Sequence, residues 1–207
     1  MERNSGILLH PTSLPENPIC GTFGKPARVW LNALAKSGIG IWQFLPLAPP
    51  DSLGSPYSSP SSFAFNPWLL DENDLVREGF LDNNIEKFSS KISDLDKRVD
   101  FQLANSKVKK LSSSLVESWG KQNETIKEEF EIWCEKQFWL EDHSIFMELR
   151  IQNNNLPWWE WPEKFAIYDK EELLNWKKDN QKELLGHNLI QWHLDRQWKA
   201  IRGLAKS

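Results

Sequence analysis

The segment 1–70 alternates short apolar runs with one amphipathic stretch. Residues 6–10 (GILLH) and 41–45 (IWQFL) are continuous apolar runs of strand length, and each is followed by proline. Between them, residues 25–36 carry apolar positions near helical spacing, and Gly38 and Gly40 follow as helix-ending residues. The helical positions are Val29, Trp30, Ala33 and Leu34. A strand, a helix and a second strand in this order predict a βαβ unit with parallel strands.

From residue 71 onward the pattern becomes helical and charged, and glycine and proline become rare. Asp71 to Asp74 form an acidic cluster that favours capping of a short helix reaching Phe80, rather than catalysis. The link 156–162 (LPWWEWP) is rigid and aromatic. A polar connection is predicted over 82–93, and helices over 94–118, 125–153 and 170–205. Ile190, Leu194, Trp198, Ile201 and Ala205 give the last helix its apolar stripe.

The loop 46–67 leaves the carboxyl end of the second predicted strand. Its six prolines exclude a helix or a central strand, and α/β folds place their sites at this end of the strands. Within it, Pro56 fixes the backbone between Ser55 and Tyr57, so that a hydroxyl and a phenol ring are presented together. This pair suits a polyol ligand, but Tyr57 could equally serve to pin the loop.

Composition and charge narrow the classes of function. The chain has 207 residues with a net charge of -4, which disfavours nucleic-acid binding. Two cysteines allow no disulfide framework, and no apolar run approaches 18 residues, so we expect a cytoplasmic protein without membrane spans or export. Metal-binding, phosphate-loop and nucleophile-elbow motifs are missing, so no metal or cofactor is expected. The 12 tryptophans favour core packing over sugar stacking, although both interpretations stay open.

Several motifs along the chain resemble the N-terminal part of the 4-α-glucanotransferases, also called amylomaltases or disproportionating enzymes. The opening stretch 6–15 (GILLHPTSLP) and the loop sequence 54–57 (GSPY) carry most of the resemblance. Further matches are 42–47 (WQFLPL), 66–67 (NP), 139–142 (WLED), 161–162 (WP) and 197–200 (QWKA). The segment 49–51 (PPD) before the loop motif is similar to the plant and cyanobacterial version of the family.

The resemblance implies an α/β fold, the first two strands of a (β/α)8 TIM barrel with a large helical insertion. The expected division is 1–70 for the first βαβ unit, 71–169 for the insertion, and 170–207 for a long helix leading back to the barrel. The chain is then the first portion of a longer protein, since two strands cannot close a barrel. The oligomeric state is left open.

The resemblance also implies transfer of α-1,4-glucan segments between maltooligosaccharides by a retaining mechanism with two carboxylates. The family carries these carboxylates on later strands, so no residue here receives a catalytic role and the chain alone is expected to be inactive. Ser55 and Tyr57 match positions that line the glucan cleft, and Asp51 and Asn66 are weaker candidates for substrate binding. The alternatives are a non-catalytic carbohydrate-binding remnant and a structural helical domain.

Two positions depart from the family pattern. Ser52 stands where many bacterial members have a tyrosine of an accessory glucan site, which puts that site in doubt. Phe65 replaces the usual glycine before Asn-Pro and is expected to change the packing of the loop. His10 is expected to be a hydrogen-bonded structural residue. Trp158, Trp159 and Trp161 are expected to pack in a core or an interface rather than to form a surface starch site.

Overall fold

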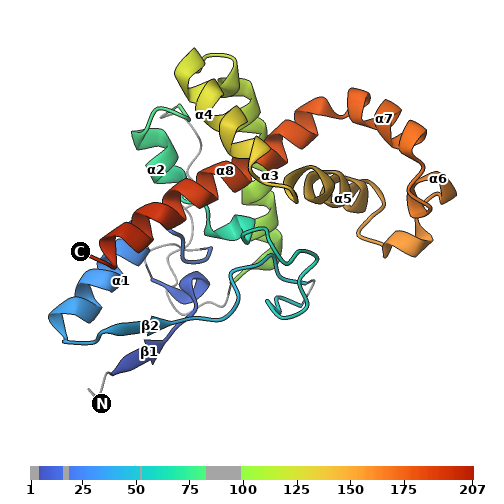
Figure 1. Cartoon of the computed structure of the whole chain (residues 1–207). Helices are drawn as coiled ribbons and strands as arrows, with labels where there is room; N and C mark the ends of the chain where they lie inside the picture. The colour runs from blue at the N-terminus through green and yellow to red at the C-terminus, as the bar shows by residue number, and fades with distance from the viewer. Residues whose placement is uncertain (1–4, 16–18, 52, 83–98) are drawn as a thin grey trace.

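A parallel pair of short strands forms the start of the fold, as the sequence predicts. The computed structural model describes residues 5–15, 19–51, 53–82 and 99–207. Strands β1 (Gly6–Leu8) and β2 (Ile41–Gln43) pair in parallel, with Ile7 opposite Trp42, and helix α1 (Lys25–Lys36) connects them (Figure 1). Both strands are shorter than the predicted runs because each continues into a proline-containing segment, which cannot extend the ladder.

The rest of the described chain is helical and is arranged around one long helix, α8 (Gln181–Leu204). This helix packs against α1, α3, α4, α5 and α7, which lie along its length. Helix α2 lies above α8 in Figure 1, on the side away from the two strands. The bounds of the remaining elements are η1 (Pro11–Ser13), η2 (Pro67–Leu69), α2 (Glu72–Arg77), α3 (Phe101–Trp119), α4 (Glu124–Glu135), α5 (Leu140–Gln152), η4 (Trp158–Glu160), α6 (Glu163–Ala166) and α7 (Lys170–Asp179).

The predicted helices over 125–153 and 170–205 are each two helices. The first breaks at residues 136–139, between α4 and α5, where Glu141 and Asp142 then occupy the first turn of α5. Acidic side chains are favourable at a helix N-terminus, which gives α5 a start of its own. The second breaks at Asn180, whose side-chain amide donates to the carbonyl of Trp176 at 2.7 Å and so caps α7. The predicted connection 82–93, apart from its first residue, and the start of the predicted helix at 94 lie outside the described residues.

The core lies where α8 meets α3 and the short helical turn η2. Three residues of the predicted stripe, Ile190, Leu194 and Ile201, are buried, and Trp198 is half-buried. Ala205, at the end of the stripe, is exposed because it follows the last residue of α8. Tryptophan packing follows the expectation in most places: all of the tryptophans lie in described residues, and Trp158 and Trp159 are the two that are exposed. Trp161 is buried against Phe146, with ring centroids 5.4 Å apart. The core interpretation therefore holds for Trp161 but not for its two neighbours.

Candidate functional site

The loop 46–67 is closed at its base by two contacts. The amide of Asn66 donates to the carbonyl of Leu47 at 2.7 Å, so the chain between them leaves and returns at one place. On the other side, Nε2 of His10 donates to the carbonyl of Pro46 at 3.3 Å, and its Nδ1 accepts from the hydroxyl of Thr12 at 2.7 Å. Burial lowers the pKa of His10, which favours this neutral form. His10 is thus the hydrogen-bonded structural residue that the sequence predicts.

Asp51 organises the tip of the loop. Its Oδ1 accepts from the backbone amides of Leu53 at 2.9 Å and of Ser55 at 2.8 Å, which is the usual role of an aspartate in a turn. Gly54 adopts a φ of +83° in this turn, and a Cβ there would lie 2.3 Å from the ring of Phe101. Only glycine fits this conformation and this space. Asp51 therefore holds Ser55 in position and has one oxygen committed to the loop itself.

Ser55 and Tyr57 are brought together at the surface of this turn. The Ser55 hydroxyl oxygen accepts from the amide of Tyr57 at 3.3 Å, and the hydroxyl hydrogen has no acceptor among the described residues. The Tyr57 side chain is 72% exposed, so its ring does not pin the loop to the body of the protein. The structure thus decides against the pinning role and leaves the phenol ring available to a ligand.

Asn66 lies in a different environment from Ser55 and Tyr57. It is 3% exposed, and its Oδ1 accepts from the amide of Trp68 at 3.0 Å at the start of η2. These contacts give Asn66 a clear role in the turn before Pro67. A glucan contact by its side chain would require the loop to open.

Two glutamines of α8 hold the backbone at and after the far end of the loop. Gln197 belongs to the QWKA match, but nothing in the sequence indicates that either glutamine makes such a contact. The Gln191 amide donates to the carbonyl of Phe65 and accepts from its amide, both at 2.9 Å. Gln197 makes the same paired contact with the backbone of Asp71, again at 2.9 Å in both directions. A glutamine between apolar helix positions gives no sequence signal for such a contact, because the partner lies far away along the chain.

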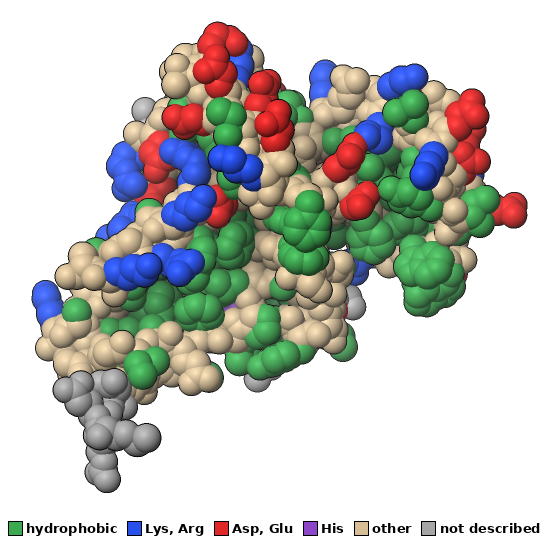
Figure 2. All heavy atoms as spheres, viewed as in Figure 1, with side chains coloured by type: hydrophobic (Ala, Val, Ile, Leu, Met, Phe, Trp, Pro, Cys, Tyr) green, Lys and Arg blue, Asp and Glu red, His purple; other side chains and the backbone are tan. Residues whose placement is uncertain are grey.

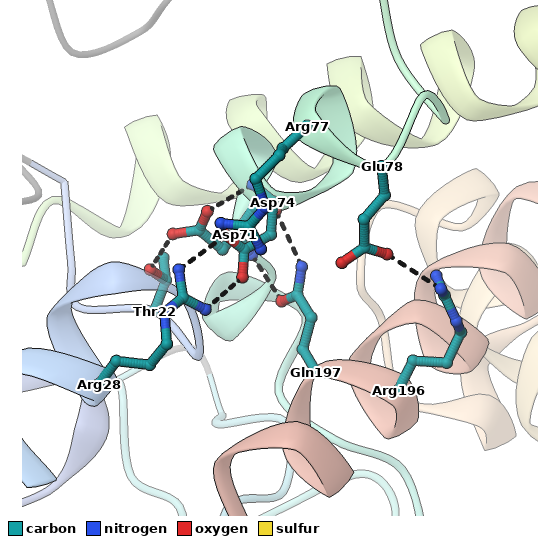
Figure 3. Close-up of polar contacts among 8 residues, drawn as sticks. All are labelled: Thr22, Arg28, Asp71, Asp74, Arg77, Glu78, Arg196 and Gln197. Carbon is teal, nitrogen blue, oxygen red and sulfur yellow. Dashed lines mark hydrogen bonds and ion pairs between the residues drawn. The ribbon is translucent and has the colours of Figure 1, made fainter. Parts of the chain in front are cut away.

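The acidic cluster at 71–74 is structural, as predicted. Asp71 caps α2 by accepting from the amide of Asp74 at 2.9 Å, and it also accepts from the hydroxyl of Thr22 at 2.6 Å (Figure 3). Both carboxylate oxygens of Asp74 are bound by the Arg28 guanidinium, at 2.6 and 2.8 Å. The hydrogen bonds to Asp74 raise the pKa of Arg28. A carboxylate engaged in this way is a poor candidate for acid–base catalysis.

The described residues offer no group of three histidine, cysteine, aspartate or glutamate side chains that could hold a metal ion. His187 contacts Glu148 at 3.1 Å, and this hydrogen bond lowers the pKa of Glu148. Cys20 is free and buried, and burial raises its pKa to about 11, which disfavours the reactive thiolate. Within the described part of the chain, the groups best placed to meet a ligand are therefore those of the loop.

Comparison with known proteins gives the family. A protein-family profile described as 4-alpha-glucanotransferase matches residues 9–207. This chain belongs to that family. It is 33% identical to a 4-alpha-glucanotransferase of Synechocystis sp. over 99% of this chain. It is 34% identical to a 4-alpha-glucanotransferase of Thermus thermophilus over 100% of this chain. The solved amylomaltase from Streptococcus agalactiae in complex with acarbose superimposes with a TM-score of 0.90 at 28% identity, over 99% of this chain.

The chain spans about two fifths of the length of these 4-alpha-glucanotransferases: 40% of the Synechocystis protein and 41% of both the Thermus protein and the Streptococcus structure. The resemblance that the motifs indicated is therefore correct, and it concerns the N-terminal portion of the family.

The two departures from the family pattern have different outcomes. Ser52 lies outside the described residues. Phe65 is half-buried and packs edge-on against Phe23, with ring centroids 5.9 Å apart, and at an angle to Trp198 at 6.2 Å. The Phe65 side chain thus turns into the body of the protein, where Gln191 holds its backbone. That this packing differs from the packing in other family members stays a prediction.

Proposed function

We propose that this chain is the N-terminal, glucan-binding part of a 4-α-glucanotransferase, which transfers α-1,4-glucan segments between maltooligosaccharides with retention of configuration. The observation that carries the proposal is the exposed Tyr57 ring beside Ser55, on a loop that is closed at its base and leaves a parallel strand. A flat ring can cover the C–H face of a sugar while a neighbouring hydroxyl bonds its oxygens. Asp51 and Asn66 are the weaker substrate contacts in this proposal, and Asn66 contributes only when the loop opens, because it is buried.

The proposed architecture is the start of a (β/α)8 barrel. Two features support it: β1 and β2 pair in parallel around α1, and α8 lies against α1 as a second covering helix would. Under this proposal, residues 71–169 form an insertion and α8 leads back to the barrel. None of the described helices is long and apolar enough to cross a bilayer. A cytoplasmic location, with both cysteines free, completes the proposal.

The purified chain is expected to show no disproportionation of maltotriose. In a retaining mechanism, one carboxylate forms the glycosyl-enzyme and a second acts as acid and base. The resemblance places both on later strands, and Asp71 and Asp74 of the cluster at 71–74 are engaged in structural contacts. The measurement is chromatography of the products after incubation with maltotriose, with heat-treated protein as the control. Glucose and longer maltooligosaccharides above that control would contradict the expectation.

Tyr57→Ala is expected to weaken binding of maltoheptaose about tenfold, because loss of a stacking ring costs about 1 kcal/mol or slightly more. Tyr57→Phe retains the ring and is expected to bind within a factor of about two or three of the unchanged chain. Isothermal titration measures both. Val29→Ala, at an exposed position on α1, serves as the control. Equal affinities for Tyr57→Ala and the unchanged chain would remove Tyr57 from the site and favour the structural alternative.

A further inference from the structure

An aromatic contact joins the loop to the turn between α4 and α5. The Phe63 ring lies edge-on to Phe138, with centroids 5.1 Å apart, and nearly parallel to Trp139 at 6.4 Å. Phe63 is 58% exposed and Phe138 is 80% exposed, so neither ring is part of the core. Hydrophobic side chains gather across the middle of this face of the molecule (Figure 2). The loop and the helical region therefore share one exposed aromatic surface.

A cleft of about 410 Å³ opens beside Phe138. It lies between the α4–α5 turn, α5 and the helices α7 and α8, and its wall combines apolar and polar side chains. The polar ones that matter here are Gln137, Glu141, Lys177 and Asn188. Glu141 of α5 and Lys177 of α7 form an ion pair across the helices. A volume of this size admits a sugar ring, whereas an exposed apolar patch alone would not define a ligand.

Hydrogen-bonding capacity remains in this wall. Asn188 uses its Oδ1 to accept from the hydroxyl of Ser144 at 2.5 Å, which leaves its NH2 group as a donor. The side-chain amide of Gln137 has no partner among the described residues, and it offers both a donor and an acceptor. Amides and charged groups around an aromatic ring are the combination that binds a hydroxyl-rich ring. A purely apolar partner would leave these groups unpaired.

The cleft is not arranged for covalent chemistry. Ser144 and Lys177 in its wall are engaged with Asn188 and Glu141. Burial raises the pKa of the Cys134 thiol to about 12, with the charge of Glu131 acting in the same direction. The thiolate is the reactive form of cysteine, so this group stays inert at neutral pH. A binding role remains.

We propose that the cleft beside Phe138 is a second glucan-binding place, in which Phe138 stacks on a sugar ring and Gln137 and Asn188 bond its hydroxyls. The proposal rests on the function proposed above, because the occupant is a maltooligosaccharide of the same kind. Phe63 lies between the loop site at Tyr57 and the cleft, so that one glucan chain can run from Tyr57 over the aromatic surface into the cleft. Longer oligosaccharides would then bind more tightly than short ones.

The test is a titration of the 15N-labelled chain with maltoheptaose, followed by NMR of the side-chain amides of Gln137 and Asn188. Both signals are expected to shift in the unchanged chain. In Phe138→Ala the midpoint of these shifts is expected to rise about fivefold, as loss of one stacking contact predicts. Its melting temperature should not change, because the ring is exposed. Ile132→Ala, at an exposed position on α4 outside the cleft, is the matched control and should titrate like the unchanged chain.

Tyr57→Ala separates this inference from the proposed function. If the cleft amides still shift in this variant, the cleft binds glucan independently of the loop. If, in the unchanged chain, the backbone amide signals of Ser55 and Tyr57 shift while the side-chain amides of Gln137 and Asn188 do not, the cleft proposal is overturned and the loop proposal stands. If neither set moves at millimolar maltoheptaose, both are overturned. An unchanged midpoint in Phe138→Ala removes the stacking role and with it the proposed site.

Discussion

Asp71→Ala is expected to lower the free energy of unfolding by about 3 kcal/mol, since it removes a helix cap and leaves buried donors unpaired. Asp71 is 2% exposed. Its carboxylate accepts from the amide of Asp74 at 2.9 Å and from the hydroxyl of Thr22 at 2.6 Å, so alanine would strand both donors in the interior. The same carboxylate fills the space beside Gly24, where a Cβ would lie 2.0 Å away, and alanine would leave a void there. Urea denaturation measures the loss.

A surface cap provides the matched control for this experiment. Asp100 caps α3 by accepting from the amide of Leu103 at 2.9 Å, but it is exposed, so Asp100→Ala should cost only about 1 kcal/mol. Asp71→Asn keeps an acceptor for the helix and is expected to fall between the two alanine variants. If Asp71→Ala costs no more than Asp100→Ala, the bond to Thr22 and the filled space contribute nothing, and the interpretation of this cluster as a structural centre is wrong.

The same residue marks how far the sequence can predict the fold. The capping role of Asp71 is a local signal, because the cap and the capped amide are three positions apart. Its contact with Thr22 and the paired contact of its backbone with Gln197 join segments that are distant along the chain. Periodicity carries no information about such contacts. The βαβ unit is predictable for the same reason as the cap, since each element has its own pattern and parallel pairing follows from the order.

The helix boundaries show a second limit. An apolar stripe can continue through a turn when both helices pack against the same neighbour, and α4 and α5 both pack against α8. The pattern over 125–153 therefore favours one helix, although Glu141 and Asp142 interrupt it. At Asn180 the break depends on one side chain that bonds the preceding turn. An asparagine such as Asn180 is compatible with a continuous helix and with a break, and tertiary packing decides between the two.

For the candidate site, the local chemistry of the loop is predictable and its surroundings are not. Proline spacing and the Ser55–Pro56–Tyr57 sequence indicate a stiff loop with an exposed hydroxyl and ring, and the exposure of Tyr57 agrees. Phe63 is recognisable in the sequence only as a loop aromatic, because its partner Phe138 lies in a turn within a predicted helix. The aromatic surface between loop and cleft joins residues that are distant along the chain, so no local sequence pattern predicts it.

The pH dependence of stability is expected to be dominated by buried histidines. His193 is fully buried on α8, and its ring centroid lies 4.4 Å from that of Phe80. Its Nδ1 accepts from the Arg196 guanidinium at 3.1 Å, and its Nε2 has no hydrogen-bond partner in the described part of the chain. Burial, followed by the charge of Arg196, lowers the pKa of His193 to about 3. Burial, followed by the nearby His187, lowers the pKa of His143 to about 4. Both residues are therefore neutral in the folded chain at pH 5 and above.

The direction in which stability changes with pH follows from the difference in histidine pKa between the folded and the unfolded chain. The unfolded histidine takes up its proton near its ordinary pKa of 6.5, while folded His193 stays neutral down to about 3. Between these values the unfolded state binds more protons, so stability falls as the pH falls. Each histidine contributes a slope of about 1.4 kcal/mol per pH unit once the pH is well below 6.5. Acidification to pH 5 should thus cost about 2 kcal/mol through His193 alone.

His193→Gln tests this expectation through the slope rather than through absolute stability. Glutamine does not titrate, so the variant should lose a large part of the decrease in unfolding free energy measured between about pH 6.5 and 5. His143→Gln should lose a similar part, and His10, whose pKa burial also lowers, contributes to the remainder. Working above pH 5 avoids the window in which Glu148, whose pKa is lowered by His187, begins to protonate. Repacking around glutamine can lower stability at every pH without altering the slope. If the slope of His193→Gln equals that of the unchanged chain, this histidine is already charged in the folded state, and the contact with Arg196 must rearrange to permit it.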